Sequence, residues 1–337
     1  MKLILQIPCL NEADTLAEAL AGLPGRIPGV SGIETLIVDD GSTDDTVEVA
    51  EQLGVNHILR HHRNLGLARA FATGLDACLA LGADIIVNTD GDAQYPAAAV
   101  PDLVAPIVAG RADIVIADRR IQELTHFSPL KKLFQAAGSW LVRTVSGTEV
   151  PDAPSGFRAY SREAALRLNI LTRYSYTLET IIQAGKLGMR ILSVPVRINA
   201  PTRPSRLQRS GWHFVKAQAG TVLRLYAFYE PLRTFTYVAA PFLLAGLFLL
   251  ARFGYYYFLV DQRGPTRFLQ SLNLGIGLSL VGLIIFLVGV QADIISKHRQ
   301  LTQDTLYRLR RIELERPERL GTMGGSYARH DRQDPAR

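Results

Sequence analysis

The chain of 337 residues is long enough for one domain of about 200–250 residues and a second region. Apolar residues make up 48% of it and are concentrated in two long stretches near the C-terminus, and the net charge of +6 reflects basic residues that cluster around these stretches. This pattern indicates a membrane surface and phosphate-bearing substrates, and it argues against nucleic acid as the partner.

The N-terminal two hundred residues alternate between short apolar runs and amphipathic stretches. We expect strands at 3–7, 33–38, 55–59, 83–88 and 112–117, with helices ending near residue 20 and covering 65–81 and 97–108. No signal peptide is expected, because the first strand begins directly after Met1 and Lys2. The two cysteines, Cys9 and Cys78, have neither disulfide nor zinc spacing, which fits a reducing compartment. The order of elements predicts an α/β fold with a doubly wound, mostly parallel sheet.

Acidic residues follow the second predicted strand. Ser42 or Thr43 is expected to cap the next helix, with Asp44 and Asp45 in its first turn. Asp39 and Asp40 lie at the strand end itself, where a helix cap has less need of them.

A second acidic pair follows the strand predicted at 83–88. Asp90 and Asp92 flank Gly91, and Gln94 comes two residues later. Ligands of open α/β sheets bind beyond the carboxyl ends of the strands. Two hard oxygen ligands at this place suit Mg²⁺ or Mn²⁺, which share phosphate oxygens of the substrate. The next strand ends at Arg119, a side chain suited to phosphate.

Four motifs resemble family 2 glycosyltransferases and occur in that family's order: Pro8 with Asn11–Glu12, the run 38–43 (VDDGST), Asn64–Leu65–Gly66 and Asp90–Gly91–Asp92. Together they resemble the GT-A nucleotide-diphospho-sugar fold over roughly residues 2–200. A Rossmann dinucleotide enzyme is disfavoured, because no G-x-G-x-x-G follows the first strand.

The resemblance implies a role for each of these residues. Asp39 would accept a hydrogen bond from the nucleotide base. Arg119 would hold the departing diphosphate, and Asp92 and Asp152 would complete the catalytic set. The implied metal ligands are Asp90, Asp92 and Gln94. The implied donor-binding residues are Pro8, Asn11, Glu12, Asp39, Asp40, Gly66 and Asp90.

The acceptor is indicated by a separate resemblance. Asp152 and the following run 155–158 (SGFR) resemble the polyprenyl-phosphate glycosyltransferases, the dolichyl-phosphate mannose synthase group, as does 202–207 (TRPSRL). The Q-x-x-R-W motif of processive synthases is not matched by 208–212 (QRSGW). An amphipathic helix is expected within 126–145. The residues expected to bind the acceptor phosphate are Lys132, Arg158, Arg203 and Arg206.

Two segments are long and apolar enough to cross a bilayer. The segment 235–260 contains Arg252 as its single charge and 268–292 contains none, while a span needs about 20 apolar residues. Basic residues before the first and after the second segment place both termini in the cytoplasm. The predicted organisation is a GT-A domain at 1–200, a basic amphipathic juxtamembrane segment at 201–233, two transmembrane helices at 234–296 and a charged cytoplasmic tail at 297–337.

These features predict a membrane-anchored inverting enzyme that moves a hexose from a GDP- or UDP-linked sugar to a polyprenyl phosphate. Because a phosphate monoester is largely dianionic at neutral pH, it needs no strong base, and Asp152 would orient the acceptor or the sugar. Two alternatives remain open. In one, a glycan or protein hydroxyl is the acceptor and Asp152 is an obligatory base. In the other, the protein is a non-catalytic membrane module that binds nucleotide sugars or glycolipids. A homo-oligomer is compatible with either.

Overall fold

A computed structural model of the chain describes residues 1–120, 139–140, 142–170, 176–199, 227, 229–260 and 268–315. The chain divides into two compact units, Met1–Gln218 with Asp304–Arg337, and Ala219–Gln303. The first unit contains a β-sheet with its helices, and the second contains an apolar helical hairpin.

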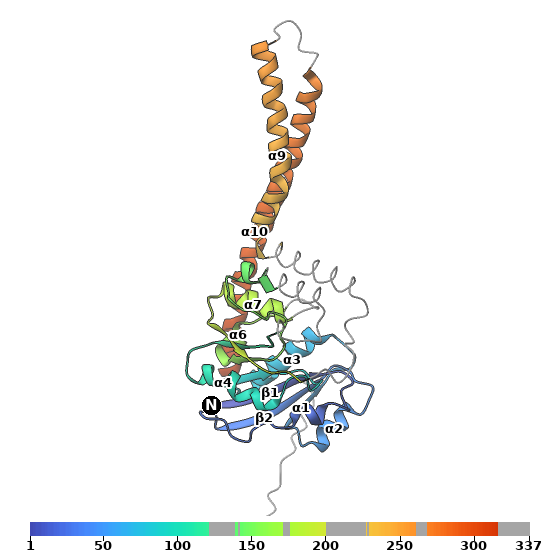
Figure 1. Cartoon of the computed structure of the whole chain (residues 1–337), viewed down its shortest axis with the longest axis vertical. Coiled ribbons are helices and arrows are strands. Elements are labelled where there is room, and N and C mark those ends of the chain that lie inside the picture. Colours follow the sequence, from blue (N-terminus) through green and yellow to red (C-terminus); the bar gives the residue numbers. More distant parts are fainter. Residues whose placement is uncertain are drawn as a thin grey trace, which may run out of the picture. The chain divides into compact units, whose positions relative to one another are not determined.

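The sheet has seven strands in the order β3-β2-β1-β4-β6-β5-β7. Strand β6 is antiparallel to both β4 and β5, and the other neighbours are parallel. This arrangement confirms the predicted mostly parallel α/β sheet. The strands, labelled where space allows in Figure 1, are β1 (Lys2–Cys9), β2 (Gly32–Asp39), β3 (His57–Arg60), β4 (Ile85–Asn88), β5 (Ile114–Asp118), β6 (Arg158–Ser161) and β7 (Ile191–Pro195).

Helices cover both faces of the sheet. One face packs its alternate strand residues, such as Leu3, Leu5 and Ile7, against the apolar sides of α1, α2 and α4. The other face packs against α3, which adjoins α6 and α7. The helices are α1 (Leu16–Leu20), α2 (Thr46–Gln52), α3 (Leu67–Ala80), the 3₁₀ turn η1 (Ala97–Ala99), α4 (Val100–Val108), α6 (Arg162–Arg167) and α7 (Tyr176–Lys186).

The predicted cap of the second helix is wrong. Helix α2 begins at Thr46, and Asp45 at its N-cap makes no side-chain capping bond. Ser42 and Thr43 lie earlier, in the loop, where both bond to Asn11. Strands β6 and β7 were also not anticipated, because the prediction stopped at the fifth strand.

The second unit is an antiparallel hairpin of α9 (Pro231–Tyr255), extended by the π-helical η3 (Tyr256–Val260), and the first part of α10 (Leu269–Glu315). Small residues allow a close approach, because a Cβ at Gly246 would lie 2.4 Å from the Ser279 hydroxyl and one at Gly282 would lie 2.7 Å from Leu243. Both helices are long and apolar enough to cross a membrane, and only 11% and 17% of their most apolar windows are buried. A core helix of a soluble protein would be mostly buried.

Helix α10 does not end where the tail was predicted to begin, at residue 297, but continues to Glu315. Its last turns belong to the first unit, where the Arg310 guanidinium donates to the Leu168 carbonyl at 2.8 Å and pairs with Asp76 at 3.3 Å. The Tyr307 hydroxyl donates to Glu163 at 2.9 Å. The predicted juxtamembrane segment at 201–233 and the tail beyond 315 lie largely or wholly outside the described residues.

Candidate active site

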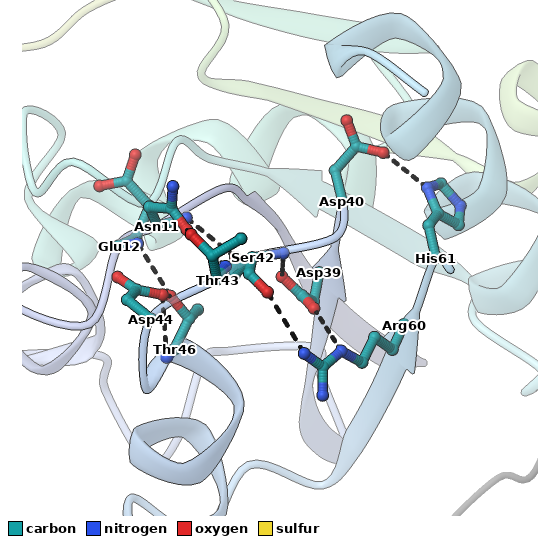
Figure 2. A network of polar contacts seen from close by, with 10 residues as sticks. All are labelled: Asn11, Glu12, Asp39, Asp40, Ser42, Thr43, Asp44, Thr46, Arg60 and His61. Atoms are coloured by element: carbon teal, nitrogen blue, oxygen red, sulfur yellow. Dashed lines mark hydrogen bonds and ion pairs between the residues drawn. The ribbon is translucent and has the colours of Figure 1, made fainter. Parts of the chain in front are cut away.

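The residues of the site come from loops that follow the carboxyl ends of β1, β2, β4 and β5. Parallel pairing of β1 with β2 aligns Cys9 with Asp39, so the loop at Asn11 lies beside the loop at Ser42. Figure 2 shows the contacts that join these two loops with Arg60 and His61 at the end of β3. The predicted gathering of functional residues at the carboxyl edge is therefore present.

Asp39 combines full burial with an unsatisfied oxygen. Its Oδ1 atom accepts a hydrogen bond from the Ser42 amide at 2.9 Å. Its Oδ2 atom lies 3.1 Å from Arg60 Nε but without hydrogen-bond geometry, and no described donor satisfies it. A buried carboxylate oxygen without a donor is costly, so this atom is suited to accept from an N–H of a ligand.

Asn11 and Glu12 join the first loop to its neighbours. Asn11 has a left-handed φ of 56°, its amide donates to Ser42 Oγ at 2.8 Å, and its Oδ1 atom accepts from the Thr43 amide at 2.8 Å. The Glu12 amide donates to Thr46 Oγ1 at 2.9 Å. The Thr15 hydroxyl lies 2.9 Å from Glu12 Oε2 and 2.7 Å from the Gly91 carbonyl, which brings this loop to the acidic turn after β4. Pro8 is buried in β1, just before this loop.

Asp40 organises the loop that leads into α3. Its two oxygens accept from the amides of Leu65 at 2.9 Å and Gly66 at 2.8 Å, and His61 Nδ1 lies 2.7 Å from Oδ1. Gly66 has a φ of 94°, a left-handed conformation that glycine adopts without a Cβ clash. Asp40 thus fixes the conformation of the loop at 61–66. His61 was not anticipated from the sequence.

The acidic turn after β4 places Asp90 and Asp92 together. The Gln94 amide donates to Asp92 Oδ1 at 3.1 Å, and Ala93 between them has a φ of 58°. Asn199 supports the turn by donating to the carbonyls of Ala93 and Gln94. Burial, and then the negative charge of Asp92, raise the pKa of Asp90 to about 7.

This turn fits a divalent cation in its donor chemistry. It offers carboxylate and amide oxygens, the ligands that hard cations prefer. Burial is the main cause of the raised pKa of Asp90 and the charge of Asp92 adds to it, so a cation beside the two carboxylates would stabilise their charged forms. Within the described ranges, no group of three or more His, Cys, Asp or Glu side chains forms a complete metal cage. Mg²⁺ or Mn²⁺ bound here would therefore take further ligands from phosphate and water.

A buried ion pair lies at the end of β5. Arg119 Nε donates to Asp152 Oδ2 at 2.7 Å, and Nη2 donates to Oδ1 at 2.8 Å. The Arg119 amide donates to the same carboxylate at 3.2 Å. The two side chains are 12% and 3% exposed, so the bidentate pair fixes the guanidinium plane. The charge of Arg119 also lowers the pKa of Asp90, which places the guanidinium within electrostatic reach of the acidic turn.

The structure contradicts the prediction that Arg158 binds the acceptor phosphate. Its side chain is fully buried, and its guanidinium donates to the carbonyls of Ala153, Ser155 and Thr177 and to the Thr180 hydroxyl. The other three residues predicted for that role lie outside the described ranges: Lys132, Arg203 and Arg206.

Gly156 also belongs to the candidate site, although the sequence motif at 155–158 did not predict this. A Cβ at this position would lie 2.8 Å from Asp90 Oδ2 and 3.0 Å from the Tyr176 hydroxyl. The Asp90 carboxylate therefore packs directly over the Gly156 backbone. The signal in the sequence was the glycine of the 155–158 run, whose reason only the structure reveals.

Comparisons with known proteins identify the family of this chain. Residues 5–168 match the family described as Glycosyl transferase family 2. An uncharacterized glycosyltransferase of Mycobacterium tuberculosis is 33% identical over 192 residues, 56% of this chain and 82% of the relative. An undecaprenyl-phosphate mannosyltransferase of Micrococcus luteus is 28% identical over 206 residues, 58% of this chain and 83% of that protein.

Solved structures support the fold. Glucosyl-3-phosphoglycerate synthase of Mycobacterium tuberculosis, in complex with Mn²⁺, uridine diphosphate and phosphoglyceric acid, superimposes with a TM-score of 0.54. The match is 23% identical and covers 67% of this chain and 78% of that one, which bears on the fold alone. The predicted GT-A fold and the predicted kinship with polyprenyl-phosphate glycosyltransferases are confirmed. The chain belongs to glycosyl transferase family 2 and is a glycosyltransferase.

Proposed function

We propose that this enzyme moves a hexose from a nucleoside diphosphate sugar to a polyprenyl phosphate at a membrane surface. The observation that carries the proposal is the buried Arg119–Asp152 pair beside the Asp90–Asp92 turn. A fixed guanidinium and a carboxylate pair suited to a divalent cation are what a departing diphosphate requires, because negative charge develops on its oxygen as the sugar bond breaks.

The donor nucleotide would bind across the loops after β1 and β2. The unsatisfied Oδ2 atom of Asp39 would accept a hydrogen bond from an N–H of the base, as a uracil or guanine can supply. Pro8, Asn11 and Glu12 would line this pocket, while Asp40 and Gly66 would hold its wall through the bonds of the 61–66 loop. The bases of UDP and GDP both carry an N–H that this acceptor would bind, so either kind of sugar donor fits.

The metal would be held by Asp90, Asp92 and Gln94. When bound, Mg²⁺ or Mn²⁺ would supply positive charge to the diphosphate oxygens. Arg119 would donate to the same leaving group, and Asp152 would keep its guanidinium in one orientation. These residues stabilise the charge that develops in the transition state, which is where stabilisation accelerates a reaction.

The reaction would be a single displacement with inversion. An oxygen of the acceptor phosphate forms a bond to the anomeric carbon, while the bond from that carbon to the diphosphate oxygen breaks and its electron pair leaves with the nucleoside diphosphate. A phosphate monoester has a second pKa of about 6, so no proton needs to be removed at neutral pH. Asp152 is consistent with this chemistry, because both of its oxygens already accept from Arg119.

The acceptor assignment is supported by the hairpin and by kinship. Apolar side chains cover α9 and the first part of α10, so the chain has a means to stay at a lipid surface. The Micrococcus luteus relative is named for an undecaprenyl phosphate. From the sequence, Lys132, Arg203 and Arg206 are the cations proposed to bind the acceptor phosphate, as charge-assisted contacts.

The proposal is tested with purified full-length protein in detergent. A panel of UDP- and GDP-sugars is incubated with a C55 polyprenyl phosphate and either Mg²⁺ or Mn²⁺, and lipid products are weighed by mass spectrometry. We expect one sugar to be transferred, with transfer lost in excess chelator and in Asp92→Asn. Asp45→Asn is the matched control, because this exposed acid makes no capping bond, and it should retain full activity.

Transfer only to a sugar or protein hydroxyl would overturn the acceptor assignment, and full turnover in chelator would overturn the metal role.

Membrane orientation is tested separately by single cysteines. We propose that both termini are cytoplasmic, so a cysteine at Gly264 should react with an impermeant reagent from outside and one at Ser326 should not. The native Cys9 and Cys78 are buried and add no background. The reverse labelling would contradict the two-span orientation.

A further inference from the structure

We infer that Arg158 is a positioning residue for sugar transfer, holding the loop that carries Asp152 and Gly156 in the geometry that Arg119 and Asp90 need. This inference rests on the proposed function. The side chain is fully buried, and besides holding the loop its positive charge lowers the pKa of Asp90, so a variant that keeps the charge isolates the effect of the loop.

The guanidinium of Arg158 ties two segments together. Nη2 donates to the Ala153 carbonyl at 2.6 Å and Nε donates to the Ser155 carbonyl at 2.7 Å, both within the loop before β6. Nη1 donates to the Thr177 carbonyl at 2.8 Å and to the Thr180 hydroxyl at 2.7 Å, both on α7. The guanidinium thereby connects the loop to a helix whose contacting residues lie 19 and 22 positions later in the sequence.

The fastened loop supports both charges of the site. Asp152 lies directly before Ala153, and its carboxylate holds the Arg119 guanidinium. Gly156 lies directly after Ser155, and the Asp90 carboxylate packs over it. A shift of this loop by a few tenths of an ångström would therefore move the cation and one carboxylate together, although Arg158 itself contacts neither through a hydrogen bond.

Other buried polar groups also hold this loop. Asn88 Nδ2 donates to the Gly156 carbonyl at 2.9 Å and lies 3.0 Å from the Tyr176 hydroxyl. Gln6 Nε2 donates to Asn88 Oδ1 at 2.9 Å, which links the loop to β1. All of these side chains are buried. Asn88 fixes the Gly156 end of the loop and also meets α7 at Tyr176, so the specific contribution of Arg158 is to connect the Ala153 and Ser155 carbonyls to α7.

The chemistry of this arrangement favours a positioning role over a purely stabilising one. A buried guanidinium carries a large desolvation cost, and the four hydrogen bonds described above for Arg158 all go to neutral oxygens. An apolar side chain of similar volume would fill the same space without that cost. Only the planar fork of arginine can reach carbonyls in the loop and on α7 at the same time.

The test compares Arg158→Lys with Arg162→Lys. Lysine keeps the charge but loses the fork. Arg162 is the matched control, because it also donates to carbonyls, those of Leu79 and Ala83, but away from the site. We expect Arg158→Lys to lower kcat about tenfold or more, as loss of one charge-assisted contact in the transition state would, with the donor KM changed less than about threefold. Arg162→Lys should leave kcat unchanged, whatever it does to the melting temperature.

A second variant and a second measurement keep the inference testable if Arg158→Lys folds poorly. Thr180→Val removes one acceptor of the guanidinium at constant size and should lower kcat in the same direction, by a smaller factor. Hydrogen exchange measured by mass spectrometry should show faster exchange in 152–157 for Arg158→Lys and not for Arg162→Lys. Hydrogen exchange does not require turnover, so it tests the role of Arg158 separately from the proposed function. Failure of the wild type to transfer sugar to a lipid would overturn the proposed function, and the exchange measurement would still test the inference. Equal kcat for the two lysine variants, or unchanged exchange in the loop, would overturn the inference.

Discussion

Replacing Asp152 by asparagine separates an orienting role from a base role. The substitution keeps the size of the side chain and removes its charge. The bidentate pair with Arg119 would lose one strong acceptor, because the asparagine amide presents N–H groups to a guanidinium that has only donors. We expect a less stable protein whose Arg119 no longer has one fixed orientation.

The magnitude follows from burial and geometry. The two bonds of 2.7 and 2.8 Å join side chains that are 12% and 3% exposed. Breaking such a buried pair by changing one partner costs about 3–5 kcal/mol, and the lower end applies because asparagine retains one acceptor oxygen. For a unit of this size each kcal/mol lowers the melting temperature by about 2–4 °C. Loss of a charge-assisted contact in the transition state should lower kcat roughly tenfold to a hundredfold.

The assay is a double-mutant cycle with Arg119→Lys. Lipid product is measured for the wild type, Asp152→Asn, Arg119→Lys and the double variant, each normalised to folded protein. If Asp152 acts only through Arg119, it has little left to do once the guanidinium fork is gone, so Asp152→Asn should change kcat by less than about threefold in the Arg119→Lys background. A further loss of tenfold or more in that background would mean that Asp152 acts on the acceptor itself, as a base for a hydroxyl would.

Two other predictions concern the strand β7 edge and the acidic turn. The hydrogen bond from Arg190 holds the pKa of Asp113 below its usual value, so Asp113 stabilises the fold above the pKa of the unfolded chain and this contribution is lost as the pH falls through the folded-state pKa. Asp113→Asn should therefore lower the melting temperature slightly at pH 7, and a difference that persisted well below pH 3.9, about the ordinary aspartate value, would be inconsistent with this cause. Gly156→Ala should lower kcat at least tenfold, because its Cβ would lie 2.8 Å from an Asp90 oxygen, whereas Gly32→Ala, with no atom within 4 Å, should match the wild type; equal kcat for both would refute the packing argument.

The strands that carry the candidate site were predictable from local sequence. Apolar runs bounded by glycine or acidic residues identified β1, β2, β4 and β5 within a few residues of their observed ends. The position of the acidic turn was predictable as well, because residues that directly follow β4 must lie at the carboxyl edge of the sheet. The edge position of Arg119 followed in the same way.

The part of the candidate site around Asp152 and Arg158 was harder to predict because it depends on contacts between distant segments. Strand β6 is only four residues long and pairs antiparallel with two parallel strands, which no local period reveals. The sequence could not distinguish an arginine that binds phosphate from one that ties a loop to a helix, and Arg158 is the second kind. The misplaced cap has a similar origin, since Ser42 bonds to Asn11, 31 residues earlier.

The proposed acceptor is tested most directly by measuring whether the enzyme transfers sugar to a lipid phosphate or to a lipid alcohol. Purified wild-type enzyme, saturated with its nucleotide sugar and metal, is given polyprenyl phosphate or free polyprenol of the same length, and the rate of lipid-linked sugar formation is measured. We expect rapid transfer to the phosphate, with an inverted anomeric configuration at the new bond, and no transfer to the alcohol. Comparable rates on both lipids, or sugar attached to an oxygen other than that of the phosphate, would contradict this expectation.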